Sequence, residues 1–116
     1  MAIILIIDDD IVFSKLTCSR LEKEGHTVFT VEDGRSGLFQ LKMMPAALVI
    51  TDILMPGGDG LQIIIDLRVN FSRVKIIAVS GTKELLASAE SLGAHAVLVK
   101  PVSKEDLIST VNRLLH

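Results

Sequence analysis

The chain has little of what marks secreted or nucleic-acid-binding proteins: one cysteine, no tryptophan, no tyrosine and four phenylalanines in 116 residues. A single thiol, Cys18, cannot form an intrachain disulfide, which favours a reducing, cytoplasmic setting. So few aromatic rings leave no stacking platform for single-stranded nucleic acid. The net charge of −2 supplies no basic field for a phosphate backbone. We therefore expect no direct binding of nucleic acid.

Long hydrophobic runs are also missing, although the mean hydropathy is positive at +0.51. A helix that spans a bilayer needs about 18 consecutive apolar residues, and no run in the chain approaches that length. Residues 1–7 are apolar but lack a basic segment and run directly into three aspartates, so they do not form a signal peptide. The sequence predicts no membrane association. A parallel sheet covered on both faces explains the hydropathy better, because its strands are continuous aliphatic runs.

Five such apolar runs alternate with helix-like segments along the chain. Short crossovers of this kind require parallel strands and right-handed connections. The sequence therefore predicts one α/β domain over residues 1–116, a three-layer αβα sandwich of (βα)5 type. It is doubly wound, flavodoxin-like, with the strand order 2-1-3-4-5. The predicted strands are residues 3–7, 27–31, 47–51, 75–79 and 96–99, and the predicted helices begin near Ile11, Asp33, Leu61, Thr82 and Ser103.

Capping residues and apolar spacing refine the helices. The predicted caps are Asp33, Thr82 and the pair Ser103–Asp106 at amino ends, with Gly25 and Gly93 at carboxyl ends. In the first helix we expect Phe13, Leu16 and Leu21 to face the core. Cys18 lies roughly 200° around the helix from Leu16, so we expect an incidental thiol that points away from the core. The expected apolar stripe of the fourth helix is Leu85, Ala89 and Leu92.

Polar residues stand at the carboxyl ends of four strand-like runs: Asp8 and Asp9, Asp52, Ser80 and Lys100. In an open parallel sheet these ends meet at one crevice. Two carboxylates about 4 Å apart repel by roughly 4 kcal/mol at an effective dielectric constant near 20. Three such pairs cost on the order of 10 kcal/mol, more than one lysine offsets. A metal or protons must enter, and carboxylates with water as the other ligands suit Mg²⁺.

Other site chemistries lack their residues. The histidines, His26, His95 and His116, share no ligand spacing, which argues against zinc. The first strand–helix turn has neither a G-x-G-x-x-G pattern nor a Walker lysine, so nucleotides are poor candidates. Ser80 is not in a G-x-S-x-G turn, which argues against acyl transfer.

Five short motifs, in order and with matching spacing, resemble the receiver domain of two-component response regulators, in particular chemotaxis-type regulators. The resemblance covers the whole chain. The motifs are Asp8-Asp9-Asp10, Thr51-Asp52-Ile53-Leu54-Met55-Pro56, Asp59-Gly60, Val79-Ser80-Gly81 and Val99-Lys100-Pro101.

The resemblance implies a role for each motif residue at the metal. Asp52 corresponds to the phosphoacceptor, whose carboxylate attacks a phosphohistidine to form an acyl phosphate. Asp9 corresponds to a direct Mg²⁺ ligand and Asp8 to a ligand that acts through water. Asp52 and the backbone carbonyl of Leu54 complete the protein's share of the metal ligands. Phosphoryl transfer needs positioning and charge neutralisation, which such a site supplies.

The resemblance also implies a switch and partners. Ser80 corresponds to a hydroxyl that moves to bond a phosphoryl oxygen, and Lys100 to the cation that pairs with that group, after a cis Lys100–Pro101 bond. The implied partners are a sensor histidine kinase or a histidine phosphotransfer protein, and a downstream effector or output domain. The implied output face is formed by the fourth helix, the fifth strand and the fifth helix. Such a domain is a signalling module, not an enzyme beyond phosphorylation and dephosphorylation of itself.

The chain departs from the family pattern at several positions. Val97 stands where many receivers carry Tyr or Phe, so a ring cannot report phosphorylation here. Gly58 replaces a bulky apolar residue, and Leu54 and Thr82 occupy positions that tune access of hydrolytic water. Asp10 and Asp59 are expected to be cap or turn residues, not ligands.

Two other functions compete with the receiver. A haloacid-dehalogenase-like phosphatase also uses a strand-end aspartate with Mg²⁺, and Asp8-x-Asp10 fits the start of its D-x-D-x-T motif. Val12, however, fills the threonine position, and the chain is short for that fold. A pseudo-receiver acting only as an interaction domain is the third candidate, and the intact acceptor, metal and lysine positions count against it.

Overall fold

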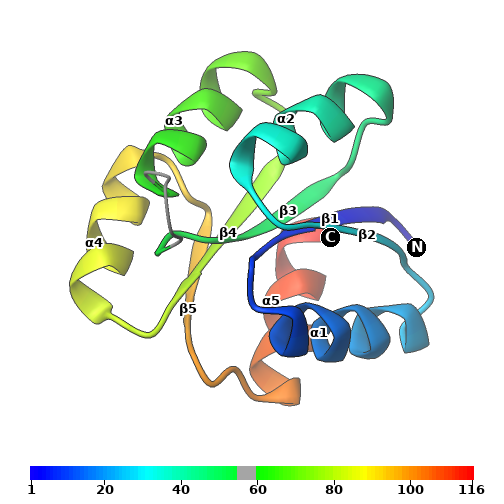
Figure 1. The fold of residues 1–116 in the computed structure, drawn as a ribbon. Helices are drawn as coiled ribbons and strands as arrows, with labels where there is room; N and C mark the ends of the chain where they lie inside the picture. Colours follow the sequence, from blue (N-terminus) through cyan, green and yellow to red (C-terminus); the bar gives the residue numbers. More distant parts are fainter. Residues whose placement is uncertain (55–59) are drawn as a thin grey trace.

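The side chains of the central strands point alternately to two separate hydrophobic cores, one on each face of a single sheet. The structure is a computed structural model that describes residues 1–54 and 60–116. Its elements run in strict β–α alternation (Figure 1). They are β1 (Ile3–Ile7), α1 (Ile11–Lys23), β2 (Thr27–Val31), α2 (Gly34–Met43), β3 (Leu48–Asp52), α3 (Gly60–Asn70), β4 (Lys75–Ser80), α4 (Lys83–Leu92), β5 (Ala96–Val99) and α5 (Lys104–Leu115).

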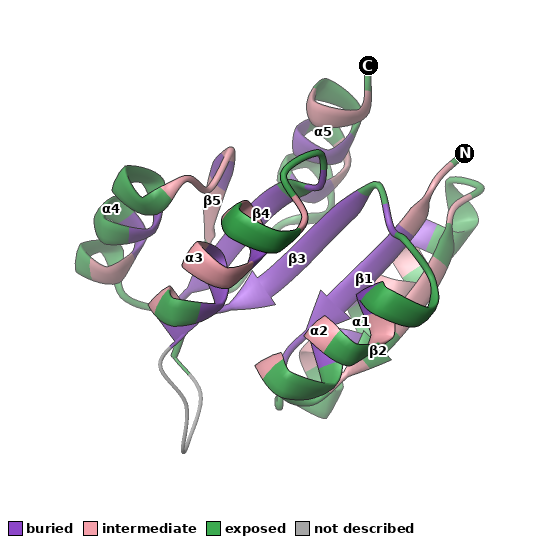
Figure 2. Cartoon of the chain, turned by 90° about the horizontal axis from the view of Figure 1, so that it is seen from above, coloured by how far each residue is buried: buried purple, intermediate pink, exposed green. Residues whose placement is uncertain are grey.

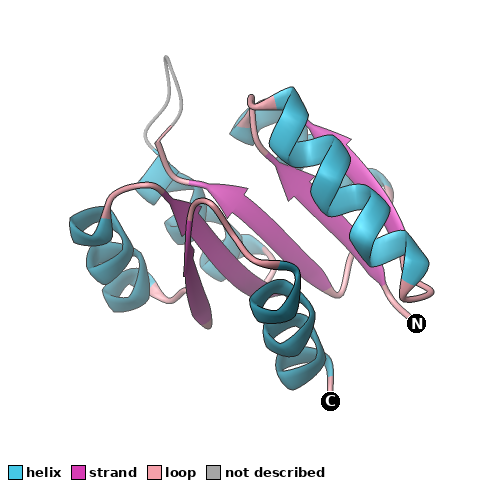
Figure 3. Cartoon of the chain, turned by 90° about the horizontal axis from the view of Figure 1, so that it is seen from below, coloured by secondary structure: helices cyan, strands magenta, loops and turns pink. Residues whose placement is uncertain are grey.

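The five strands are all parallel and follow the order β2-β1-β3-β4-β5, which confirms the predicted fold and strand order. Helices α2, α3 and α4 cover one face of the sheet in the view from above (Figure 2), and α1 and α5 cover the other in the view from below (Figure 3). The chain reverses its winding between β1 and β3. In folds of this class, ligands bind at the carboxyl ends of the strands beside that reversal.

Alternate residues of β1, β3 and β4 divide between the two cores, as the strand period of two requires. The α2–α4 side buries residues such as Leu5, Val49 and Ile76 against Ile64 and Leu67 of α3. The α1–α5 side buries the intervening set, listed here with its helical partners: Ile4, Ile6, Leu48, Ile50, Ile77, Val79, Leu21, Leu107 and Val111. The continuous aliphatic runs in the sequence are therefore the signature of a sheet buried on both faces.

Helix ends follow the predicted caps with one difference. Asp33 accepts a hydrogen bond from the Ser36 N–H at 2.7 Å, and Ser103 Oγ accepts one from the Asp106 N–H at 3.1 Å. Gly93 adopts a positive φ of 119° at the end of α4, a conformation that favours glycine. Thr82 is the N-cap residue of α4, but its side chain makes no capping hydrogen bond.

The predicted apolar face of α1 is wrong at Leu16, which is 48% exposed. The buried side of this helix is Ser14, Thr17 and Leu21, spaced as one helical face requires. The prediction that Cys18 points away from the core is wrong for the same reason, because it places Cys18 on the side of the helix opposite Leu16. Since Leu16 points outward, Cys18 points inward; it is half-buried and packs against the α1–α5 core.

The stripe of α4 is also displaced by part of a turn. Leu86 and Ala89 are its buried residues, whereas Leu85 is half-buried and Leu92 is exposed. Two strands end one residue later than predicted, because Asp52 closes β3 and Ser80 closes β4. Asp52 and Ser80 therefore belong to the sheet itself, not to the loops after it.

Candidate functional site

Three aspartates meet at the carboxyl edge of the sheet. Asp8 follows β1, with its N–H bonded to the Val31 carbonyl of β2 at 3.0 Å, and Asp52 ends the neighbouring strand β3. One carboxylate oxygen from each of Asp8, Asp9 and Asp52 lies within 4.8 Å of the others. Asp8 and Asp52 are buried and Asp9 is exposed. The strand reversal thus brings together the three acids that the sequence predicted to share a crevice.

Lys100 is the cation of this cluster. Its Nζ lies 2.9 Å from Asp8 Oδ2 and 3.3 Å from Asp52 Oδ2. The Phe13 ring lies beneath the same ammonium, with 4.4 Å between Nζ and the ring centroid, a cation–π geometry. Asp10 is more distant, at 3.9 Å. Lys100 follows the outer strand β5, so its side chain must reach across the sheet edge to the acids of β1 and β3.

Hydrogen bonds hold the two buried carboxylates in place. Asp8 Oδ1 accepts the Asp10 N–H at 2.8 Å, and Asp52 Oδ1 accepts the Leu54 N–H at 3.0 Å. The second oxygen of Asp52 faces Lys100. The second oxygen of Asp8 has the Lys100 ion pair, yet no donor among residues 1–54 and 60–116 is aligned to give it a hydrogen bond.

Burial and the crowding of charge shift the pKa values of Asp8 and Lys100. Burial raises the pKa of the Asp8 carboxyl, and the negative charge of Asp52 acts in the same direction, against the opposing effect of Lys100 and the Asp10 N–H. Burial alone would lower the pKa of the Lys100 ammonium, but its attraction to the carboxylates of Asp8 and Asp52 outweighs burial and raises that pKa. Among residues 1–54 and 60–116, Lys100 is the cation that pairs with these carboxylates, Asp10 included.

This donor set fits a divalent cation. Carboxylate oxygens without imidazole or thiolate select a hard ion. Asp8 Oδ2 is buried with only the Lys100 ion pair in the described part of the chain, so this carboxylate oxygen can accept one further hydrogen bond. The acidic cluster therefore offers the oxygen ligands that a hard divalent cation takes.

Ser80 lies at the same edge, where its hydroxyl bonds to Thr82 at the start of α4. It is fully buried, and its Oγ accepts the Thr82 N–H at 3.1 Å and lies 3.3 Å from Thr82 Oγ1. This local bond ties Thr82, the N-cap residue of α4, to the end of β4. Ser80 is thus placed where a local movement of its hydroxyl would disturb the start of that helix.

Several predicted details of the site have clear outcomes. Asp10 is the N-cap of α1, where its carboxylate accepts the Phe13 N–H, which confirms its predicted role. The Lys100–Pro101 peptide bond is cis, as the resemblance implied. The motif residues Met55-Pro56, Gly58 and Asp59 lie outside the described residues.

Two contributions to the site were not predicted. Phe13 was assigned to the core only, but its ring also contacts Lys100. Ser14 was not singled out, yet it is buried with its Oγ bonded to the Asp8 carbonyl at 3.4 Å. A signal for both was available: they lie one turn into the helix that directly follows the acidic motif, where side chains pack back toward the helix start.

Comparison with known proteins agrees with this geometry. The chain matches the response regulator receiver domain family over residues 4–112. It is 34% identical to protein PilH of Pseudomonas aeruginosa, over 99% of this chain and 98% of PilH. Among solved structures, the chemotaxis response regulator CheY4 of Vibrio cholerae is similar with a TM-score of 0.90 and 27% identity, covering 98% of each chain.

Longer relatives contain a matching segment. The chain is 33% identical to a transcriptional regulatory protein of Picosynechococcus sp., over 97% of this chain but 49% of that protein. It covers 26% of the transcriptional regulatory protein GlrR of Escherichia coli, at 32% identity. The chain thus spans about half or less of these relatives, and nearly all of PilH.

The chain belongs to the response regulator receiver domain family. It is a receiver domain of two-component signal transduction, with the CheY-like fold of its structural neighbours. This family is a family of signalling domains, which act with kinases and output domains. Membership of this family rules out the haloacid-dehalogenase-like phosphatase as the function of the chain. No helix in residues 1–54 and 60–116 is long and apolar enough to cross a membrane.

Proposed function

We propose that Asp52 accepts a phosphoryl group from the phosphohistidine of a sensor kinase or a histidine phosphotransfer protein. An Asp52 carboxylate oxygen attacks phosphorus, the P–N bond breaks, and the imidazole of the donor leaves with the bonding electrons and gains a proton. The observation that carries the proposal is the position of Asp52: it ends a central strand within reach of two acids and one lysine.

Mg²⁺ is the proposed cofactor, held by Asp9, Asp52 and the Leu54 carbonyl, with Asp8 acting through water. Bound there, the ion neutralises charge on the transferring phosphoryl oxygens. Lys100 lies beside Asp52 and is placed to pair with a phosphoryl oxygen, and Asp8 holds Lys100 in position at 2.9 Å. The same residues support phosphorylation by small donors and self-dephosphorylation, without turnover of a separate substrate.

The test of the acceptor is mass spectrometry after incubation with Mg²⁺ and acetyl phosphate. The wild-type protein should gain one phosphoryl mass, and Asp52→Asn should gain none. Asp66→Asn on α3 is the matched control and should be labelled like the wild type. Full labelling of Asp52→Asn would overturn the assignment, and an unlabelled wild-type protein would favour a pseudo-receiver.

The partner that carries the phosphohistidine is proposed to dock on α1. Val12 is 78% exposed and Leu16 48% exposed, next to a hollow of about 330 Å³ that reaches Lys100 and Pro101. Exposed apolar residues beside a reactive group are typical of a protein interface. A phosphohistidine donor would place this interaction in the cytoplasm.

This docking face has its own test. Val12→Glu/Leu16→Glu should leave labelling by acetyl phosphate unchanged and slow transfer from the autophosphorylated kinases of the source organism. The matched control is Ser91→Glu/Leu92→Glu on α4. Equal transfer to wild type and the α1 variant would remove α1 from the interface.

The proposed output is a shift of the face formed by α4, β5 and α5. A phosphoryl group on Asp52 offers oxygens to the Ser80 hydroxyl, which would give up its bond to the Thr82 N–H at the start of α4. Val97 of β5 is half-buried against the core, so the shift must pass through backbone and aliphatic packing. Amide chemical shifts on adding Mg²⁺ and beryllofluoride, a phosphoryl mimic, test this. Changes confined to the crevice, with α4 and β5 silent, would exclude this face as the output surface.

A further inference from the structure

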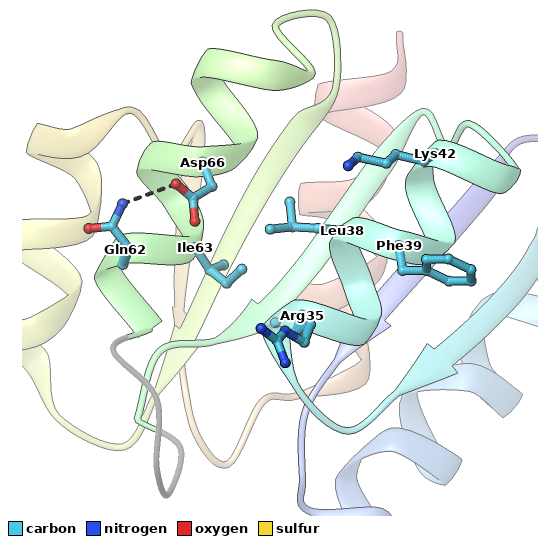
Figure 4. A pocket seen from close by; sticks show the side chains of 8 residues that line it. Arg35, Leu38, Phe39, Lys42, Gln62, Ile63 and Asp66 are labelled. Carbon is cyan, nitrogen blue, oxygen red and sulfur yellow. Dashed lines mark hydrogen bonds between the residues drawn. The ribbon is translucent and has the colours of Figure 1, made fainter.

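A second hollow lies away from the phosphoacceptor, between α2 and α3. It has a volume of about 550 Å³ and is an open groove along the two helices, with Leu38 and Ile63 pointing toward one another across it (Figure 4). The two helices meet closely at one end, because a Cβ on Gly34 would overlap the Ile63 side chain. We call this hollow the α2–α3 groove. None of the chemistry proposed above uses it.

Apolar surface continues from the groove over α2. Phe39 is 65% exposed and Met43 is 71% exposed, four residues apart on one face of the helix. Both are long apolar side chains in water beside a hollow whose own floor is apolar. Contiguous exposure of this kind marks an interaction site more often than an ordinary surface.

Basic side chains flank this apolar strip. Arg35 and Lys42 both line the groove from α2 and are seven residues apart, about two helical turns or roughly 10 Å along the axis. Neither forms an ion pair within residues 1–54 and 60–116. The acid on the opposite wall, Asp66, accepts a hydrogen bond from Gln62 on its own helix at 3.0 Å. The α2 wall is therefore positive and unpaired.

The shape of the groove selects the kind of occupant. Sites for small molecules bury most of the ligand, and an open groove between two helices does not. A helix about 10 Å across, laid along α2 and α3, would cover Leu38, Ile63 and Phe39 together. Acidic residues seven apart on such a helix would meet Arg35 and Lys42.

A second copy of this chain fits less well. Helix α1 exposes Ile11, Val12 and Leu16, and it carries Lys15, Arg20 and Lys23 against one acid, Glu22. Docking α1 on the groove would bring like charges toward Arg35 and Lys42, which costs affinity.

We propose that the α2–α3 groove binds an acidic amphipathic helix of a partner protein, at a surface separate from the phosphoacceptor crevice. Apolar residues of that helix seat on Leu38 and Ile63, and its acids pair with Arg35 and Lys42. The site does not require phosphorylation of Asp52.

The test is a peptide selection in which the charge pattern of the ligand is not fixed in advance. A display library of helical peptides with a fixed leucine stripe, and with Glu, Lys, Gln or Ser at every flanking position, is selected on the full chain. The selected peptides should be enriched in Glu at positions seven apart. The best peptide should shift the amides of α2 and α3 and should bind Asp52→Asn equally well, which separates this proposal from the phosphoacceptor.

Two matched charge-reversal variants then test whether the peptide contacts the basic residues of α2. Arg35→Glu/Lys42→Glu should weaken peptide binding at least tenfold, while Lys15→Glu/Lys23→Glu on α1 should change it less than twofold. Selection of neutral or basic peptides, or equal binding to the groove variant, would overturn the proposal. So would concentration-dependent dimerisation that shifts α2 and α3 without peptide, because the groove would then be an interface between copies.

Discussion

The two edges of the sheet treat polar groups in opposite ways. At the amino edge, imidazoles tie the outer strands to their neighbours: His26 Nδ1 accepts the Ala2 N–H at 3.1 Å, and His95 Nδ1 accepts the Ile76 N–H at 3.0 Å. At the carboxyl edge, three carboxylates gather around one lysine, and a buried Asp8 oxygen lacks a hydrogen bond.

This difference separates groups that satisfy the backbone from groups that crowd like charges within one sheet. The amino edge satisfies backbone donors at the start of the strands, which stabilises the fold. The carboxyl edge keeps like charges close together in the absence of metal, which destabilises it. We call the amino edge, with His26 and His95, the locked edge, and the carboxyl edge, with its aspartates and Lys100, the charged edge. Only the charged edge would gain free energy by binding a cation or a phosphoryl group.

The largest expected effect comes from removing the one cation of the charged edge. Lys100→Met leaves Asp8 and Asp52 buried without their ion pair, so the free energy of unfolding without metal should fall by about 3 kcal/mol. Mg²⁺ should restore much of this loss. Lys104→Met, at the exposed start of α5, is the control. Urea denaturation with and without Mg²⁺ measures both, and equal losses in the two variants would contradict the role of Lys100.

Breaking the locked edge should have a smaller effect. His95→Ala leaves the Ile76 N–H without its acceptor, which should cost about 1–2 kcal/mol. His26→Ala should behave similarly through Ala2, whereas His116→Ala at the exposed end of the chain should be neutral. These losses should be independent of Mg²⁺. A loss in His95→Ala that Mg²⁺ repairs would show that the two edges are not separate.

The smallest expected effect is a dependence on pH. Burial lowers the pKa of His95, with Lys75 and Arg68 acting in the same direction. Burial also lowers the pKa of His26, as does the chain's amino terminus. The unfolded chain then binds protons more readily just below the ordinary histidine pKa of 6.5. Stability should therefore be fully present above pH 6.5 and fall as the pH drops below it.

The double variant His26→Ala/His95→Ala checks the source of this slope. Thermal unfolding between pH 7.5 and about 5.5, above the range where most carboxylates titrate, should show a flatter profile for the variant than for the wild type. An unchanged slope would assign the pH dependence to other groups.

Much of the charged edge could be predicted from sequence. Asp8, Asp9, Asp52, Ser80 and Lys100 all stand at the ends of aliphatic runs, and parallel strands must bring such ends to one edge. The fold could be predicted from the same runs, because a strand that is buried on both faces is a continuous aliphatic run in the sequence. The roles of these residues in phosphoryl transfer remain predictions.

The locked edge could not be predicted in this way. His26 and His95 each precede a strand, but their Nδ1 partners belong to other strands and depend on the register of pairing. The outward position of Leu16 was missed because apolar residues alone defined the face of α1. Its buried side uses Ser14, which bonds to the Asp8 carbonyl, and such hydroxyl residues carry no hydrophobic periodicity.

The contrast between the edges is tested most directly by the stability of Asp9→Asn as Mg²⁺ is added. Without metal, removal of one repelling charge should make the variant more stable than the wild type by about 1 kcal/mol. With Mg²⁺ at about 100 times its dissociation constant the wild type should gain about 2.7 kcal/mol and the variant much less, so their order should reverse. Parallel curves, or a wild type that does not respond to Mg²⁺, would contradict the account of the carboxyl edge as a metal-dependent phosphoacceptor site.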